Sequence, residues 1–171
     1  MLLFFLLSVV LVAADQITKA LAVAYLKPVT TFPIIRDVLH LTYSENTGAA
    51  FSILNGFRWG FVILALIVCG VVIYVNAARK VESKLFYAAS ILVVSGAIGN
   101  VIDRIANGAV VDFIDFRLIN FAIFNFADIC LTVGVALLFV FFLFFYGKDK
   151  KAGKDGKTAE EEAEKDEADG N

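Results

Sequence analysis

The chain has 171 residues, 60% of them hydrophobic, and a mean hydropathy of +0.80, which excludes an ordinary soluble domain of this size. Its formal net charge of -2 reflects the C-terminal residues 148–171, which hold six of the 15 Lys and Arg residues and nine of the 17 Asp and Glu residues. The remainder carries nine basic and eight acidic residues. We therefore expect one integral membrane domain over residues 1–147, followed by a charged tail.

Four segments are apolar enough to cross ~30 Å of hydrocarbon as helices, a length that takes about 20 residues. They cover roughly residues 2–26, 59–76, 85–102 and 121–146. The first resembles a signal peptide, because small residues precede Asp15. It has no Lys or Arg at its start, however, and apolar sequence resumes after Lys19, which favours a retained helix.

Basic residues predict the orientation of these helices, because Lys and Arg accumulate on the cytoplasmic side. Arg79, Lys80 and Lys84 lie between the second and third segments, and Lys148 begins the basic residues after the fourth. Both termini should then be cytoplasmic, and the loops 27–58 and 103–120 should face outward.

The outer loop 27–58 is too long for a bare connection. Residues 38–44 alternate in polarity, which predicts a strand and a small sheet on the outer membrane surface. We expect His40 at the surface or an interface rather than in catalysis. The tail 148–171 has no aromatic or branched apolar residue and is expected to be disordered.

Metal and thiol chemistry find little support. A zinc site usually needs several His or Cys ligands at motif spacing, whereas this chain has one His and two Cys. Cys69 and Cys130 fall within apolar segments and are expected to be buried thiols. We expect no metal or other cofactor, and only a carboxylate-bound ion stays open.

Polar residues gather at the outer end of the predicted bundle. An ionisable residue in a membrane span is costly and suggests function. Asp15 and Lys19 can pair at i,i+4 spacing. Asp128 lies near a helix N-terminus, where the helix dipole favours a carboxylate. The others are Asn46, Gly48, Asn100, Asp103, Arg104, Asp112 and Asn125, while Asp115 is expected to be a solvated loop residue.

Two neighbouring carboxylates could perform hydrolysis without a metal. If they lie close together, one keeps a proton, so the ionised member can activate water while the other donates a proton. Sequence alone leaves either Asp103 or Asp112 as the partner of Asp128. A dyad of Lys19 with Ser44, Ser52 or Ser95 is a weaker alternative, because no motif selects one serine.

Two further classes stay open. A proton-coupled carrier could use Asp15, Asp103 and Asp128 as a relay, but it would need polar residues through the full membrane depth. A non-catalytic assembly factor would leave the paired aspartates unexplained.

The small residues of SGAIGN, 95–100, indicate that the third predicted helix packs closely against its neighbours.

Five short motifs resemble the sequence blocks of signal peptidase II, the bacterial lipoprotein signal peptidase. They are DQITK (15–19), NTGAAF (46–51), GNVIDR (99–104), VVDF (110–113) and FNFAD (124–128), in the same order and across four predicted spans. The resemblance covers about residues 1–146 and leaves the tail outside.

The resemblance implies an aspartic protease of the bacterial inner membrane, with its site at the periplasmic face. It would cleave the signal peptide from prolipoproteins just before a cysteine that carries a diacylglyceryl group. Asp112 and Asp128 match the catalytic pair of the family. The supporting residues of the family match Asp15, Lys19, Asn46, Gly48, Asn100, Asp103, Arg104 and Asn125.

The implied fold is an all-α integral membrane protein with four transmembrane helices, a small periplasmic β-sheet and a short periplasmic helix near residues 50–57. We expect a monomer that acts on prolipoproteins, contacts membrane lipid and binds no nucleic acid.

Overall fold

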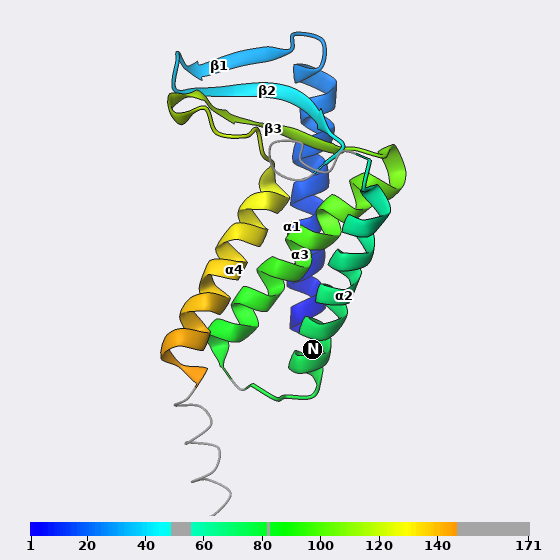
Figure 1. Ribbon diagram of the computed structural model, residues 1–171, viewed down its shortest axis with the longest axis vertical. Helices are drawn as coiled ribbons and strands as arrows, with labels where there is room; N and C mark the ends of the chain where they lie inside the picture. The colour runs from blue at the N-terminus through cyan, green and yellow to red at the C-terminus, as the bar shows by residue number, and fades with distance from the viewer. Residues whose placement is uncertain (49–55, 82, 147–171) are drawn as a thin grey trace, which may run out of the picture.

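The computed structural model describes residues 1–48, 56–81 and 83–146. Four α-helices form a bundle: α1 Leu2–Leu21, α2 Arg58–Ala77, α3 Lys84–Asn107 and α4 Phe126–Phe144. A π-helical turn, η1 Ala22–Leu26, continues α1. A sheet of three strands, β1 Thr31–Ile35, β2 Leu39–Asn46 and β3 Val110–Phe116, lies across the end of the bundle opposite the N-terminus (Figure 1).

All four helices are long and apolar enough to cross a membrane, with α1 and η1 together forming one span. The first three match the sequence prediction closely, although α3 continues to Asn107. The fourth begins at Phe126 rather than at 121, because Asn125 caps its N-terminus. Residues before it run back along β3, where Phe124 bridges to Ile114.

Helix α3 is the central helix of the bundle. In an apolar 18-residue stretch of α3, 67% of the residues are buried within the protein. The share is 22% in the corresponding stretch of each of the other three spans. Its small residues allow this, as the SGAIGN pattern predicted: a Cβ atom on Gly96 would lie 2.3 Å from the carbonyl oxygen of Ala127 on α4. Cys69 and Cys130 are buried free thiols, as expected.

The sheet is antiparallel in the order β1-β2-β3 and packs on the C-terminal end of the first span, through Leu26 and Val111 among others. The strand expected at 38–44 is confirmed as β2. Strand β3 was not predicted, because residues 103–120 were interpreted only as an outward-facing loop. Gly108, with φ +81°, ends α3 and turns the chain into this strand.

Strand β3 corrects two expectations about side chains. Asp115 is not a solvated loop residue: it is 8% exposed and accepts hydrogen bonds from Thr42 Oγ1 at 2.7 Å and Arg117 Nε at 2.8 Å. His40, expected at the surface or an interface, is buried opposite Asp115 in the strand register. Both are buried because β3 pairs with β2 along its length.

Two further expectations concern residues that the structure does not describe. The short helix near 50–57 lies outside the described residues except for Gly56 and Phe57, which are not helical. The tail 148–171 lies wholly outside them.

Candidate active site

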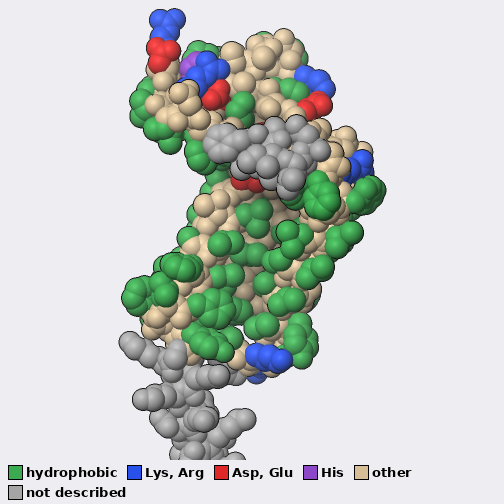
Figure 2. Space-filling view, viewed as in Figure 1, with side chains coloured by type: hydrophobic (Ala, Val, Ile, Leu, Met, Phe, Trp, Pro, Cys, Tyr) green, Lys and Arg blue, Asp and Glu red, His purple; other side chains and the backbone are tan. Residues whose placement is uncertain are grey.

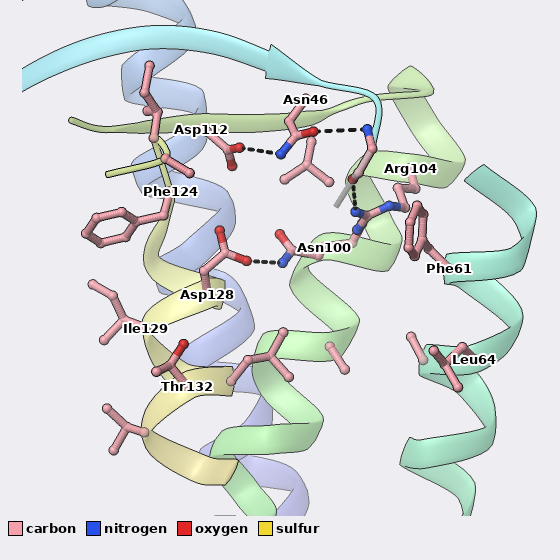
Figure 3. A pocket seen from close by; sticks show the side chains of 18 of the residues that line it. Asn46, Phe61, Leu64, Asn100, Arg104, Asp112, Phe124, Asp128, Ile129 and Thr132 are labelled. Atoms are coloured by element: carbon pink, nitrogen blue, oxygen red, sulfur yellow. Dashed lines mark hydrogen bonds between the residues drawn. The ribbon is translucent and has the colours of Figure 1, made fainter. Parts of the chain in front are cut away.

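A cavity of about 650 Å³ lies beneath the sheet, between α2, α3 and α4 (Figure 3). Its walls are mostly apolar, with Phe61 and Leu64 from α2 and Ile129 from α4 among them. Six of the residues that the sequence singled out line it: Asn46, Gly48, Asn100, Arg104, Asp112 and Asp128. Polar groups are therefore concentrated at one end of an otherwise apolar chamber.

Two carboxylates face each other across this chamber, Asp112 from β3 and Asp128 from the first turn of α4 (Figure 3). From the described part of the chain, each of their four oxygens accepts one hydrogen bond. Asp112 Oδ1 accepts from Asn125 Nδ2 at 2.6 Å, and Oδ2 accepts from Asn46 Nδ2 at 3.0 Å. Asp128 Oδ1 accepts from Asn100 Nδ2 at 2.7 Å, and Oδ2 accepts from the backbone N–H of Asn125 at 3.1 Å. All four donors are neutral amides.

Asn125 links the two carboxylates through local helix geometry. It is the N-cap of α4, and its side chain accepts a hydrogen bond from the Asp128 N–H at 3.0 Å. In return, the backbone N–H of Asn125 donates to the side chain of Asp128. This reciprocal pattern is a capping box. The same Asn125 side chain donates to Asp112, so the start of one helix fixes the position of both acids.

The environment of Asp112 favours its protonated form. Burial, followed by the negative charge of Asp128, raises the pKa of Asp112 to about 6. Hydrogen bonds from Asn46 and Asn125 act in the opposite direction, because they stabilise the charged carboxylate. A carboxyl group with this pKa can hold or release a proton near neutral pH.

A second cluster lies beside the chamber and is built around Lys19. The Lys19 Nζ atom forms salt bridges with Asp15 Oδ2 and Asp103 Oδ2, both at 2.9 Å, and donates to Asn100 Oδ1 at 3.0 Å. The predicted Asp15–Lys19 pair is thus present. All three charged side chains are buried. One ammonium group faces two carboxylates, and each carboxylate also accepts a backbone N–H.

This Lys19 cluster also holds the backbone next to each cavity carboxylate. Asp15 Oδ1 accepts the N–H of Ala127 at 2.9 Å, one residue before Asp128. Asp103 Oδ2 accepts the N–H of Val111 at 3.2 Å, one residue before Asp112. One ion cluster therefore anchors both chain segments that carry the cavity carboxylates.

Sequence reasoning missed Gln16, which completes the Lys19 cluster. Its Nε2 atom lies within hydrogen-bond distance of Asp15 Oδ2 at 3.1 Å, the Gly99 carbonyl at 3.2 Å and Asp103 Oδ1 at 3.1 Å. The available signal was an uncharged polar residue between two ionisable ones within an apolar span.

Arg104 joins the cavity to the segment that follows β2. Its Nη2 atom donates to the carbonyl of Gly48 at 2.9 Å, and its guanidinium carbon lies 5.0 Å from the centre of the Phe61 ring. Gly48 in turn donates its N–H to Asn46 Oδ1 at 2.9 Å. The turn after β2 is thereby held over the chamber, as Figure 3 shows.

The alternatives from the sequence gain little support. The Lys19 Nζ atom is occupied by two carboxylates and an amide, and Ser95 donates to the Ile91 carbonyl at 2.6 Å within its own helix. Ser44 pairs with Asp112 in the strand register, and Ser52 lies outside the described residues. Within residues 1–48, 56–81 and 83–146, no group of three or more His, Cys, Asp or Glu side chains is placed to hold a metal ion.

Comparison with known proteins identifies relatives along most of the chain. A family model described as signal peptidase (SPase) II matches residues 7–144. A lipoprotein signal peptidase from Brevibacillus brevis is 46% identical over 136 residues, which cover 79% of this chain and 91% of that protein. One from Clostridioides difficile is 42% identical over 149 residues, which cover 86% and 99%.

The fold has solved counterparts as well. A bacterial membrane enzyme solved at 2.3 Å resolution by the in meso method superimposes with a TM-score of 0.78 and 35% sequence identity, covering 84% of this chain and 88% of that one. A second, solved at 1.9 Å, gives a TM-score of 0.75 at the same identity and covers 85% and 95%.

Proposed function

Because this chain belongs to the signal peptidase II family, and is therefore a membrane-embedded protease, we propose that it uses Asp112 and Asp128 as a catalytic pair. The substrate is a diacylglyceryl-modified bacterial prolipoprotein. The bond cleaved is the peptide bond just before the lipidated cysteine.

One observation carries this proposal: two carboxylates face one cavity, and among the described residues only neutral amides donate hydrogen bonds to them. Because no described cationic group binds either carboxylate directly, the pair can retain a proton between its members. The raised pKa of Asp112, about 6, supports the same conclusion. Asp103, the other candidate partner of Asp128, is instead held in the Lys19 cluster.

The reaction then follows as proton transfers between the pair, water and the substrate. The ionised carboxylate removes a proton from a water molecule, whose oxygen attacks the carbonyl carbon of the scissile bond. The protonated carboxyl group gives its proton to the carbonyl oxygen, and a tetrahedral intermediate forms. The carboxyl group that took the proton from water then gives it to the nitrogen of the scissile bond. The C–N bond breaks as a hydroxyl of the intermediate returns its proton to the other carboxylate, which leaves a new carboxyl terminus, a free amine and the pair in its starting state.

The other polar residues would hold this arrangement in place. Asn46, Asn100 and Asn125 orient the carboxylates without adding charge. Arg104 and Gly48 line the cavity at its sheet end, where a substrate backbone would pass. Asp15, Lys19 and Asp103 fix the two segments that bear the pair.

The shape of the chamber suits a lipidated substrate. Its apolar walls, which include Leu64 and Ile129, can accept acyl chains, while the scissile bond lies at the polar end. We infer that this end faces the periplasm and that both termini are cytoplasmic. Arg79 and Lys80 support this orientation, since they follow α2 at the end of the bundle opposite the sheet.

Cleavage of a purified diacylglyceryl-modified prolipoprotein in detergent tests the proposal. We expect Asp112→Asn and Asp128→Asn each to lower kcat/KM by roughly 10³-fold or more, because asparagine keeps the shape and removes proton transfer. Asp103→Asn should retain measurable cleavage.

Asp115→Asn is the matched control, since Asp115 lies on the same strand as Asp112 but contacts Thr42 and Arg117 instead. Each variant must elute as a folded monodisperse protein. Undiminished cleavage by folded Asp112→Asn would contradict the proposed catalytic pair and make Asp103 the next candidate for the partner of Asp128.

A further inference from the structure

One end of the sheet exposes apolar side chains, three of which lie outside the lining of the proposed active site. Ile35 is 54% exposed, Leu118 63% and Ile119 65%, and Phe121, which also lines the cavity, is 51% exposed. We call these four residues the apolar tip. Clustered exposed apolar side chains usually mark an interaction surface.

The strand register brings the apolar tip together. Ile35 pairs with Leu39, and Leu39 pairs with Phe116, so all three strands end at the same place. The 3-10 turn η3, Arg117–Ile119, follows directly, and Asn120 reverses the chain with φ +48°. Leu118 and Ile119 are thus displayed on a tight turn.

The one charged residue of this turn is directed back to the sheet. Arg117 donates to Asp115 at 2.8 Å, and its Nη2 atom donates to Thr31 Oγ1 at 3.2 Å and Thr42 Oγ1 at 3.3 Å. Its charge is compensated there. The outward surface of the turn is therefore left to Leu118 and Ile119.

The apolar tip lies close to a membrane span. Phe124 pairs with Ile114, and α4 begins two residues later at Phe126. In Figure 1 the tip end of the sheet extends beyond α4, and Figure 2 shows apolar side chains along the lower edge of this overhang, with charged ones above. With α4 spanning the hydrocarbon, the headgroup layer, which adds roughly 5 Å or more to each side, would begin near the N-terminus of this helix.

We propose that the apolar tip inserts into the lipid interface beside α4, so that the sheet is attached to the bilayer at a point away from the bundle. Lipid is the occupant because the tip is continuous with a membrane-spanning helix and its exposed edge is turned toward the bilayer. Small elements with one apolar and one charged face commonly lie at this depth.

A tryptophan probe tests this placement without relying on cleavage. Trp59 is the single tryptophan, so the Trp59→Phe background is silent. Leu118→Trp in that background is reconstituted into phosphatidylcholine vesicles, with or without bromine near the headgroup end of the acyl chains. The matched control is Asp37→Trp, on the exposed turn between β1 and β2 at the same end of the sheet.

We expect brominated lipid to lower the fluorescence of the L118W probe by roughly twofold or more, and that of the D37W control far less. Aqueous iodide should quench them in the reverse order. Equal iodide quenching of both probes, with no effect of brominated lipid, would overturn the proposal.

A shielded L118W probe that neither agent quenches would also overturn it and indicate protein contact; a dilution series of protein in lipid would then identify a second copy. If Leu118→Trp does not fold, Ile119→Trp serves in its place. The readout is independent of cleavage, so it stands even where the proposed catalytic pair fails.

Discussion

Two pairs of aspartates lie at the same end of the bundle in different surroundings. Asp15 and Asp103 are buried against one ammonium group, at 2.9 Å on each side. Asp112 and Asp128 face a cavity and accept hydrogen bonds from neutral amides. Residue type and depth are shared, but the partners differ. A fixed countercharge suits a structural support, and neutral donors suit the proposed proton-exchanging pair.

The comparison also shows how the two pairs depend on each other. Each aspartate of the Lys19 cluster accepts a backbone N–H adjacent to one aspartate of the cavity pair. Asn100 joins the Lys19 cluster directly to the cavity pair, since its Oδ1 atom accepts a hydrogen bond from Lys19 and its Nδ2 atom donates one to Asp128. The proposed catalytic pair is therefore held in place by the Lys19 cluster.

Removing the ammonium should have the largest effect on stability. Lys19→Met leaves Asp15 and Asp103 buried without a countercharge, which costs about 3–5 kcal/mol. Thermal unfolding in detergent should show a markedly lower midpoint. Adding Asp103→Asn to the same variant should restore part of the loss, and an unchanged midpoint for Lys19→Met would contradict the supporting role.

Crowding the Lys19 cluster should have the next largest effect. A Cβ atom on Gly99 would lie 2.5 Å from Asp15 Oδ2, so Gly99→Ala must displace that carboxylate. We expect a loss of about 1–3 kcal/mol in the free energy of unfolding.

Gly70→Ala is the control for this change, because nothing lies within 4 Å of a Cβ atom at that position of α2. It should be neutral or slightly stabilising. Equal midpoints for the two alanine variants would show that the packing around Asp15 is looser than described.

Removing the contact of Asn100 with both the Lys19 cluster and Asp128 should mainly affect catalysis. Asn100→Leu removes the donor to Asp128 and the acceptor for Lys19, and we expect kcat/KM to fall roughly tenfold. Ser95→Ala on the same helix loses only a bond to Ile91 and should cleave normally. Full activity in Asn100→Leu would show that Asp128 needs no donor at this oxygen.

The smallest predicted effect is a shift in the pH profile. Asn46 donates to Asp112 and lowers its pKa, so Asn46→Ala should raise that pKa further above about 6. Activity needs a proton on the pair, so the alkaline limb of kcat/KM should move to higher pH. Glu45→Gln, which changes an exposed residue bound to Lys27, should leave the limb in place, and a shift toward lower pH in Asn46→Ala would reverse the assignment.

Local patterns in the sequence predicted much of this arrangement. The i,i+4 spacing of Asp15 and Lys19 and the position of Asp128 at a helix start depend on neighbours along the chain, and both are confirmed. The four apolar segments were enough to predict the four membrane-spanning helices, because such helices can be recognised from their length and hydropathy.

The sequence did not predict contacts between residues that lie far apart in the chain. Strand β3 forms because β2, which lies far earlier in the chain and pairs with it at Ser44 and Asp112 among others, offers its edge. Without that partner, Asp112 and Asp115 looked like loop residues. Gln16 was missed for the same reason, since its acceptor on α3 is 87 residues away at Asp103.

The two members of the proposed catalytic pair are mounted on different parts of the fold, Asp112 on the sheet and Asp128 on a bilayer-spanning helix. A helix responds to the hydrophobic thickness of its bilayer by tilting, and a sheet outside the hydrocarbon need not follow that tilt. Tilting of α4 would therefore act on the separation of the two acids, against the hydrogen bonds through which Asn125 holds both. We expect turnover to pass through an optimum as the lipid chain length is varied.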